Sequence, residues 1–244
     1  MKKHFILFVA VIFCLSLILP FTAMASGSCS ETTQHANALN ALGLFRGTGA
    51  GYELDKIPTR IQGLVMLIRL LGEENSALES SASHSFTDVP EWADKYVGYA
   101  IEKGYTKGIG TSTFSPDTNL DAKSYVTFVL RAIGYSDSNG DFSWSSALSD
   151  SADFRLMTKE AASALAYATF NRGDMVDISY CALTMTLKDS NRTLAQKLTS
   201  SGVFTTEQGN ASGVLGSRII YTYVPYDNST IEYCKKHILW LQAK

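Results

Sequence analysis

Apolar residues recur at helical spacing along much of this chain, in segments separated by polar stretches rich in glycine and serine. Three of these segments are strongly apolar, and the first carries apolar residues around almost its whole circumference, a pattern typical of a buried helix. They span residues 59–72, 121–134 and 171–183. Pro58 directly precedes Thr59 and Arg60, so Thr59 is a candidate N-cap for the first of these helices.

The segments that lead into the first two buried helices resemble each other. Gly43-x-x-Arg46-Gly47-x-Gly49 has its counterpart in Gly104-x-x-Lys107-Gly108-x-Gly110, and glycines at these places permit turns with positive φ. A repeated turn followed by a repeated helix predicts internal repeats. The predicted fold is therefore mainly α, with three helix-loop-helix repeats. They cover residues 32–73, 86–135 and 141–204, and the third contains an extra helix.

Two segments fall outside this pattern. Residues 73–85 are polar and serine-rich without periodicity, which predicts a linker. Residues 205–244 change character: a loop-like start is followed by an alternating stretch, typical of an edge strand because it contains Pro225, and then by a closing helix from Ser229 or Thr230. This short strand/helix tail receives no functional interpretation.

Residues 1–25 are predicted to be a signal peptide. Lys2 and Lys3 precede an apolar run over residues 5–21, and Ala23-Met24-Ala25 fits a cleavage site. The alternative is a membrane anchor that is retained, but the run is short for a permanent span and Pro20 interrupts it. We expect an exported protein with no membrane contact after cleavage.

The net charge argues against some classes of partner, and the cysteine count argues against a disulfide framework. The net charge is −2 and the isoelectric point about 6.1, which disfavours nucleic acid and a polybasic membrane surface as partners. An odd number of cysteines after residue 25 is not a disulfide framework. Cys181 lies in an apolar helix and is expected to be buried, whereas Cys29 and Cys234 remain candidates for one bridge.

The sequence offers little for catalysis. His35, His84 and His237 lack the spacing of metal ligands, and no cysteine has an evident base partner. The sequence therefore predicts a protein that is not an enzyme, with no cofactor, no catalytic residues and no metal site. The alternative of an enzyme with its site in the tail stays open.

The second repeat carries a specific set of residues that resembles the S-layer homology domain of bacterial surface proteins. The residues are Phe86-Thr87-Asp88-Val89, Trp92, Gly104, Gly108, Thr113-Phe114-Ser115-Pro116 and Arg131-Ala132-Ile133-Gly134. The family's signature, Thr-Arg-Ala-Glu at the start of the second helix, appears in degraded form in all three repeats. Its versions are Thr59-Arg60-Ile61-Gln62, Asp121-Ala122-Lys123-Ser124 and Asn171-Arg172-Gly173-Asp174.

The resemblance implies a pseudo-trimeric bundle of the three signature helices, with grooves between neighbouring units. In the family such grooves hold the secondary polysaccharide attached to wall peptidoglycan, often through a pyruvylated sugar. An arginine at a helix start offers a two-pronged donor to such a carboxylate. We therefore expect a non-covalent attachment to the wall of a bacterium, Gram-positive in type, and localisation at the cell surface.

The resemblance also implies the polysaccharide-binding residues. Arg60 and Arg172 are expected to contact the anion, with Lys123 as a weaker substitute and Trp92 as a flat platform for a sugar ring. The residues at the fourth signature position, Gln62 and Asp174, are expected to orient the arginines if that position has this role. The alternative is a degenerate scaffold whose repeats persist for packing and bind a protein partner at the cell surface.

Overall fold

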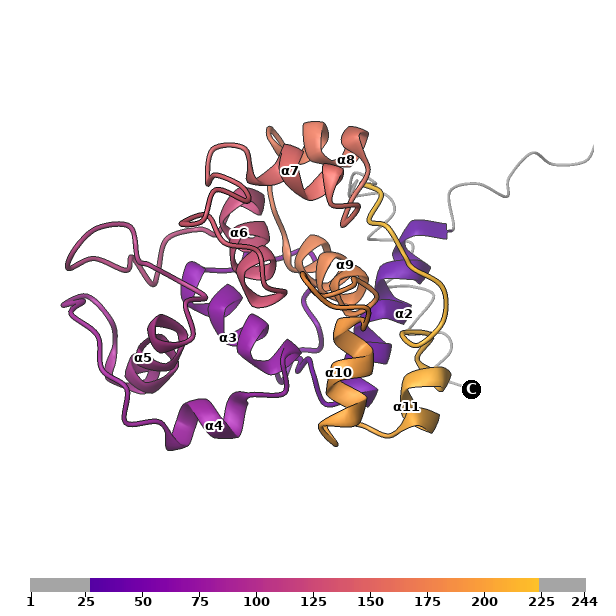
Figure 1. The fold of residues 1–244 in the computed structure, drawn as a ribbon, viewed down its shortest axis with the longest axis horizontal. Helices are drawn as coiled ribbons and strands as arrows, with labels where there is room; N and C mark the ends of the chain where they lie inside the picture. The colour runs from indigo at the N-terminus through magenta and orange to yellow at the C-terminus, as the bar shows by residue number, and fades with distance from the viewer. Residues whose placement is uncertain (1–26, 224–244) are drawn as a thin grey trace, which may run out of the picture. The chain divides into compact units, whose positions relative to one another are not determined.

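The computed structural model describes residues 27–223, and those from residue 31 on belong to one compact unit. The fold is mainly α, as predicted, and β-structure in this range is confined to isolated bridges. Figure 1 traces the helices in chain order. They are α2 (Gly27–Ala41), α3 (Arg60–Leu70), α4 (Glu74–Glu79), the 3-10 turn η1 (Glu91–Ala93), α5 (Asp94–Glu102), α6 (Ala122–Ala132), α7 (Ala147–Asp153), α8 (Lys159–Leu165), α9 (Arg172–Leu183), α10 (Leu194–Ser200) and α11 (Thr206–Ala211).

The three apolar helices predicted from the sequence are α3, α6 and α9, and each contacts the other two. Their side chains form much of one buried core, in which Leu64, Phe128 and Ile178 are almost inaccessible to solvent. The count of three homologous repeats, and their boundaries, stay predictions.

Capping explains why these helices begin where they do. The Thr59 side chain accepts a hydrogen bond from the Gln62 backbone, and the Gln62 side chain accepts one from the Thr59 N–H. Asn171 and Asp174 form the same reciprocal pair at the start of α9. The predicted N-cap at Thr59 is therefore confirmed, and two otherwise unpaired backbone donors are satisfied at each helix start.

Two loops cover the starts of α3 and α9 in the same way. The Arg60 and Ile61 amides donate to the carbonyl oxygens of residues 118 and 116, and the Arg172 and Gly173 amides donate to those of residues 56 and 54. The acceptors in the two loops are thus 62 residues apart in each case. Glu53 and Ser115, also 62 apart, both adopt positive φ, at 49° and 60°. Residues 52–58 and 114–120 therefore share one backbone conformation around each helix start.

Two segments differ from the sequence predictions. The expected linker at residues 73–85 contains α4, whose Ala77 is fully buried. The loop-like stretch after residue 205 contains α11, which begins with a Thr205–Gln208 capping box. In both segments a short polar sequence forms a helix because local capping or one buried contact suffices, which a search for long apolar periods overlooks.

The described part of the tail ends in a single bridge in place of a strand. The Tyr221 amide donates to the Leu156 carbonyl oxygen at 3.0 Å, and the Thr158 amide donates to the Tyr221 carbonyl oxygen at 2.9 Å. Cys181 is buried, as expected. The signal peptide, the closing helix and the Cys29–Cys234 pairing lie outside the residues whose side chains are described.

Candidate functional site

Three of the six predicted binding residues meet in one groove of about 220 Å³. Gln62 comes from α3, Trp92 from η1 and Arg172 from the start of α9, so the groove joins segments far apart in the sequence. Arg46 and Arg69 also line it. We call this the arginine groove. Its lining contains three arginines and no acidic residue, which makes it suited to an anion.

The hydrogen bond and the ring contact that hold Arg172 come from neutral groups, and the negative charge of Glu53 also acts on its guanidinium. Its Nε donates to the Tyr52 carbonyl oxygen at 3.0 Å, and its guanidinium carbon lies 5.5 Å from the centroid of the Phe45 ring. Burial lowers the pKa of Arg172, but an arginine stays charged at neutral pH. Within residues 27–223 the two Nη groups have no hydrogen-bond partner, so a fixed guanidinium presents two free donors.

Arg46 and Arg69 share one carboxylate. Arg69 donates to Glu74 at 2.8 Å from both Nε and Nη2, and Arg46 Nη2 lies 3.0 Å from the other oxygen of Glu74. Burial would raise the pKa of Glu74, but the hydrogen bond from Arg69 and the two positive charges outweigh it and lower that pKa. Two arginines on one carboxylate leave a positive charge beside Arg172.

Trp92 supplies the aromatic surface of the groove. Its side chain is 60% exposed although it is a large apolar group. A flat ring exposed beside polar donors is the arrangement that a sugar ring can stack on, because its C–H face is apolar and its hydroxyls are polar. The exposed ring of Trp92 lines the groove, and its role as a sugar platform stays a prediction.

Arg60 occupies a different environment from Arg172. It is only 8% exposed, and its Nε donates to the Phe114 carbonyl oxygen at 3.0 Å. Its guanidinium carbon lies 5.0 Å from the ring centroids of both Phe114 and Phe128. Burial lowers the pKa of Arg60 to about 10. These contacts give Arg60 a structural role; its expected contact with an anion stays a prediction, and the binding site proposed below does not use it.

The fourth signature position caps helices and does not hold the arginines. Asp174 is 2% exposed; one carboxylate oxygen accepts from the Asn171 amide at 3.0 Å and the other from the Tyr221 hydroxyl at 2.9 Å. Burial raises the pKa of Asp174 to about 6. The contacts of Arg60 and Arg172 are instead with backbone carbonyl oxygens and aromatic rings, and a binding role for Asp174 and Gln62 stays a prediction.

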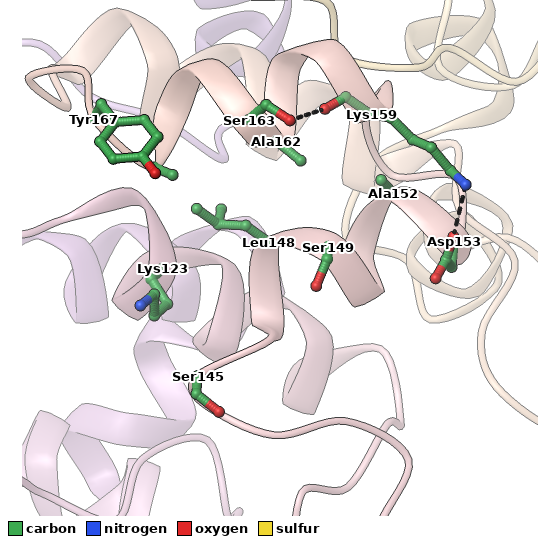
Figure 2. A pocket seen from close by; sticks show the side chains of 11 residues that line it. Lys123, Ser145, Leu148, Ser149, Ala152, Asp153, Lys159, Ala162, Ser163 and Tyr167 are labelled. Carbon is green, nitrogen blue, oxygen red and sulfur yellow. Dashed lines mark hydrogen bonds and ion pairs between the residues drawn. The ribbon is translucent and has the colours of Figure 1, made fainter.

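Lys123 lies apart from the arginine groove, in a pocket of about 480 Å³ between α7 and α8 (Figure 2). We call it the α7–α8 pocket. Of the six predicted binding residues, three therefore line the arginine groove, Lys123 lines the α7–α8 pocket, and Arg60 and Asp174 are buried in the interior. Sequence reasoning missed Arg46 and Arg69 as site residues, although Arg46 belongs to the glycine motif that reveals the repeat. Nothing in the sequence places Arg69 beside Arg172.

Comparison with known proteins supports one of the repeats directly. Residues 85–121 match the family of the S-layer homology domain. The resemblance is therefore confirmed for this segment. Across the part of the chain that the structure describes, no helix is long and apolar enough to cross a membrane.

Three similar proteins carry names that refer to the cell surface. The "Cell surface protein" of Thermoanaerobacter kivui is 32% identical over 144 residues, which are 53% of this chain and 19% of that protein. The "Middle cell wall protein" of Brevibacillus brevis is 31% identical over 120 residues, 48% of this chain and 11% of that protein. The "Surface layer protein" of Brevibacillus choshinensis is 32% identical over 103 residues, 41% of this chain and 9% of that protein. The chain thus spans less than a fifth of each relative's length.

Proposed function

From the S-layer homology match and the arginine groove, we propose that this protein acts at the bacterial cell surface by binding the wall non-covalently. The names of the three relatives support this location. Because the chain spans less than a fifth of each relative, the role assigned here concerns this chain alone. The ligand that we propose is a secondary wall polysaccharide with an anionic group, such as a pyruvylated sugar.

The observation that carries this proposal concerns Arg172, which lines the same groove as Trp92. Its two Nη groups have no hydrogen-bond partner among the described residues. Two unpaired Nη donors can bind the two oxygens of a carboxylate, and a guanidinium already fixed by Tyr52 loses little freedom on binding. The exposed ring of Trp92 then meets the apolar face of the sugar. Arg46 and Arg69 add positive charge that attracts the anionic chain.

A binding role fits this groove better than a catalytic one. Its lining contains no carboxylate, histidine, cysteine or lysine that could act as a general acid or base. Arginine and tryptophan are instead residues that dominate recognition surfaces. We therefore assign the groove to attachment.

The test is sedimentation of the purified protein with wall sacculi, intact or stripped of secondary polysaccharide. The parent protein should pellet with the intact sacculi only. Arg172→Gln should weaken this binding by roughly tenfold or more, because a charge-assisted hydrogen bond contributes about 1.5–3 kcal/mol. Arg192→Gln, at an exposed arginine outside the groove lining, serves as the matched control and should bind as the parent does.

Two results would contradict the proposal. Equal pelleting of Arg172→Gln and the parent would remove Arg172 from the site. Equal pelleting with stripped sacculi would exclude the polysaccharide as the ligand and favour a scaffold that binds a protein of the wall. A thermal unfolding curve of each variant separates loss of binding from loss of the fold.

A further inference from the structure

Residues 136–141 form a closed turn between α6 and α7. The Asp141 amide donates to the Ser136 carbonyl oxygen at 3.0 Å, and the Asp141 carboxylate accepts from the Ser136 amide at 2.8 Å. The same carboxylate forms an ion pair with Lys188, which lies between α9 and α10. The Lys188 amide in turn donates to the Ile133 carbonyl oxygen at 2.9 Å. The turn thus ties the end of α6 to the segment between α9 and α10.

The tip of this turn, Asn139 and Gly140, lacks the contacts that hold its ends. Both residues are exposed. The Asn139 backbone amide donates to Ser136 Oγ at 3.2 Å, but within residues 27–223 its side-chain amide has no hydrogen-bond partner. In the same range no group accepts a hydrogen bond from the Gly140 amide. Other asparagine side chains are held by hydrogen bonds, among them those of Asn37, Asn40 and Asn171.

Gly140 leaves its own backbone nitrogen accessible. Its φ is 81°, in the left-handed region that glycine adopts readily because it has no Cβ. A Cβ placed at this position would meet no other heavy atom within 4 Å, so the space around the residue is open. The Asn139 side chain can therefore approach the Gly140 nitrogen without meeting a substituent or a packed neighbour.

The chemistry that this arrangement permits is an attack of the backbone on the side chain. The Gly140 nitrogen loses its proton and forms a bond to Asn139 Cγ, and the bond from Cγ to the side-chain nitrogen breaks, so that ammonia leaves. The reaction is intramolecular, because the chain itself holds the two groups next to each other. Water then opens the resulting cyclic imide. Opening at Cγ gives aspartate, and opening at the main-chain carbonyl carbon gives isoaspartate.

We propose that Asn139 is a modification site, which deamidates through the Gly140 amide to aspartate and isoaspartate. In sum, water is consumed and ammonia is released, with no change of oxidation state. The reaction needs neither an enzyme nor a metal ion. It makes no use of the arginine groove, so it stands or falls independently of the proposed wall binding.

The first consequence of deamidation is a negative charge in a turn that already contains Asp137 and Asp141. Arg131 donates to both oxygens of Asp137, at 3.2 and 2.7 Å. Lys107 donates to Asp137 at 2.9 Å and to Ser138 at 2.6 Å. These cations are thus engaged before the reaction, and the new carboxylate adds repulsion between like charges.

The second consequence concerns the backbone. Isoaspartate at position 139 lengthens the main chain by a methylene group between Ser136 and Asp141. The two hydrogen bonds that join these residues close the turn around that position, so both cannot keep their geometry. Because Asp141 also pairs with Lys188, isoaspartate should loosen the connection between α6 and the segment before α10.

The test is incubation of the folded protein at neutral and at mildly alkaline pH, followed by peptide mass spectrometry. The peptide with Asn139 should gain the mass that replacement of NH by O adds, and faster at the higher pH because the attacking nitrogen must lose its proton. Asn191 is the internal control: it is exposed, but arginine follows it and the Arg192 amide donates to Ser190 Oγ at 3.1 Å. Asn191 should react at least about tenfold more slowly.

Two variants complete the experiment. Asn139→Gln should abolish the mass gain, because its longer side chain would have to close a larger ring. Asn139→Asp carries the new charge on a backbone of normal length, so the isoaspartate fraction, identified by isoaspartyl methyltransferase labelling, should melt at a lower temperature than this variant. No mass gain at Asn139 in the folded protein, a gain only in urea, or equal rates at Asn139 and Asn191 would overturn the site. Equal melting temperatures of the isoaspartate fraction and Asn139→Asp would overturn the effect on the turn.

Discussion

Arg60 Nε donates a hydrogen bond of 3.0 Å to the carbonyl oxygen of Phe114. Arg172 makes the equivalent bond, also 3.0 Å, to the carbonyl oxygen of Tyr52. Both arginines thus fasten a helix start to a loop from another part of the chain. They differ in what lies above them: the Phe128 ring packs over Arg60, whereas Arg172 borders the arginine groove. The arginine of the signature motif therefore stabilises the fold at Arg60, whereas at Arg172 it also leaves two Nη groups available to a ligand.

We expect Arg60→Ala to destabilise the protein more than Arg172→Ala. Removing the buried Arg60 side chain leaves a cavity between Phe114 and Phe128 and an unpaired carbonyl oxygen, at a cost of about 2–4 kcal/mol. Arg172 is half-buried, so its loss should cost about 1 kcal/mol. Urea unfolding followed by circular dichroism measures both. Equal losses of stability would show that Arg60 does not have the structural role assigned to it.

A buried pair of hydroxyl groups links α6 to α9. The Ser179 hydroxyl donates to the Met175 carbonyl oxygen at 2.6 Å, so its only proton is used, and the Tyr125 hydroxyl, 2.5 Å away, must donate to Ser179 Oγ. Both side chains are fully buried. The direction of this bond makes the two residues unequal.

Ser179→Ala should therefore be more harmful than Tyr125→Phe. The serine variant leaves the Tyr125 donor buried without an acceptor, at about 1–3 kcal/mol, whereas the phenylalanine variant removes the donor itself and should cost about 1 kcal/mol. The measurement is the free energy of unfolding of each variant and of the double variant. A larger loss for Tyr125→Phe would reverse the assigned direction of the bond.

Asp174 should make stability depend on pH. Burial raises its pKa in the folded state to about 6, whereas an unfolded aspartate has a pKa of about 3.9. Between these values the folded state binds more protons than the unfolded state. The free energy of unfolding should consequently decrease as the pH rises from about 4 to about 6, by on the order of 3 kcal/mol from this residue.

Asp174→Asn provides the check on this dependence. Asparagine can accept from the Asn171 amide, and its Nδ2 can donate to the Tyr221 oxygen in place of the bond that Tyr221 donates to Asp174; the cost of this reversal does not depend on pH, because asparagine does not titrate. The difference in stability between parent and variant should change across this pH range. Asp117→Asn, at an exposed position, should follow the parent at each pH. A constant difference for Asp174→Asn would mean that Asp174 does not titrate there.

The sequence predicts the helices well and the site only in part, for physical reasons. Pro58, Thr59 and the apolar period identify α3 because capping and amphipathicity are local properties. Whether an arginine at a helix start is buried depends on what packs above it, and Phe128 lies 68 positions after Arg60 in the chain. The same limit explains why Arg69 could not be assigned to the groove. The α7–α8 pocket was missed because it depends on how α8 packs, although Lys123 was identified.

Arg172→Lys tests whether geometry or charge alone serves the proposed wall binding. The guanidinium bonds the Tyr52 carbonyl oxygen through Nε and still presents two Nη donors, whereas an ammonium group is a single point of charge on a flexible stem. Arg172→Lys should therefore bind intact sacculi nearly as weakly as Arg172→Gln, with a melting temperature close to that of the parent. Sedimentation of the two variants side by side, at constant salt, makes the comparison. If lysine restores most of the binding, positive charge is what the groove contributes, and the two-pronged contact with a carboxylate must be abandoned.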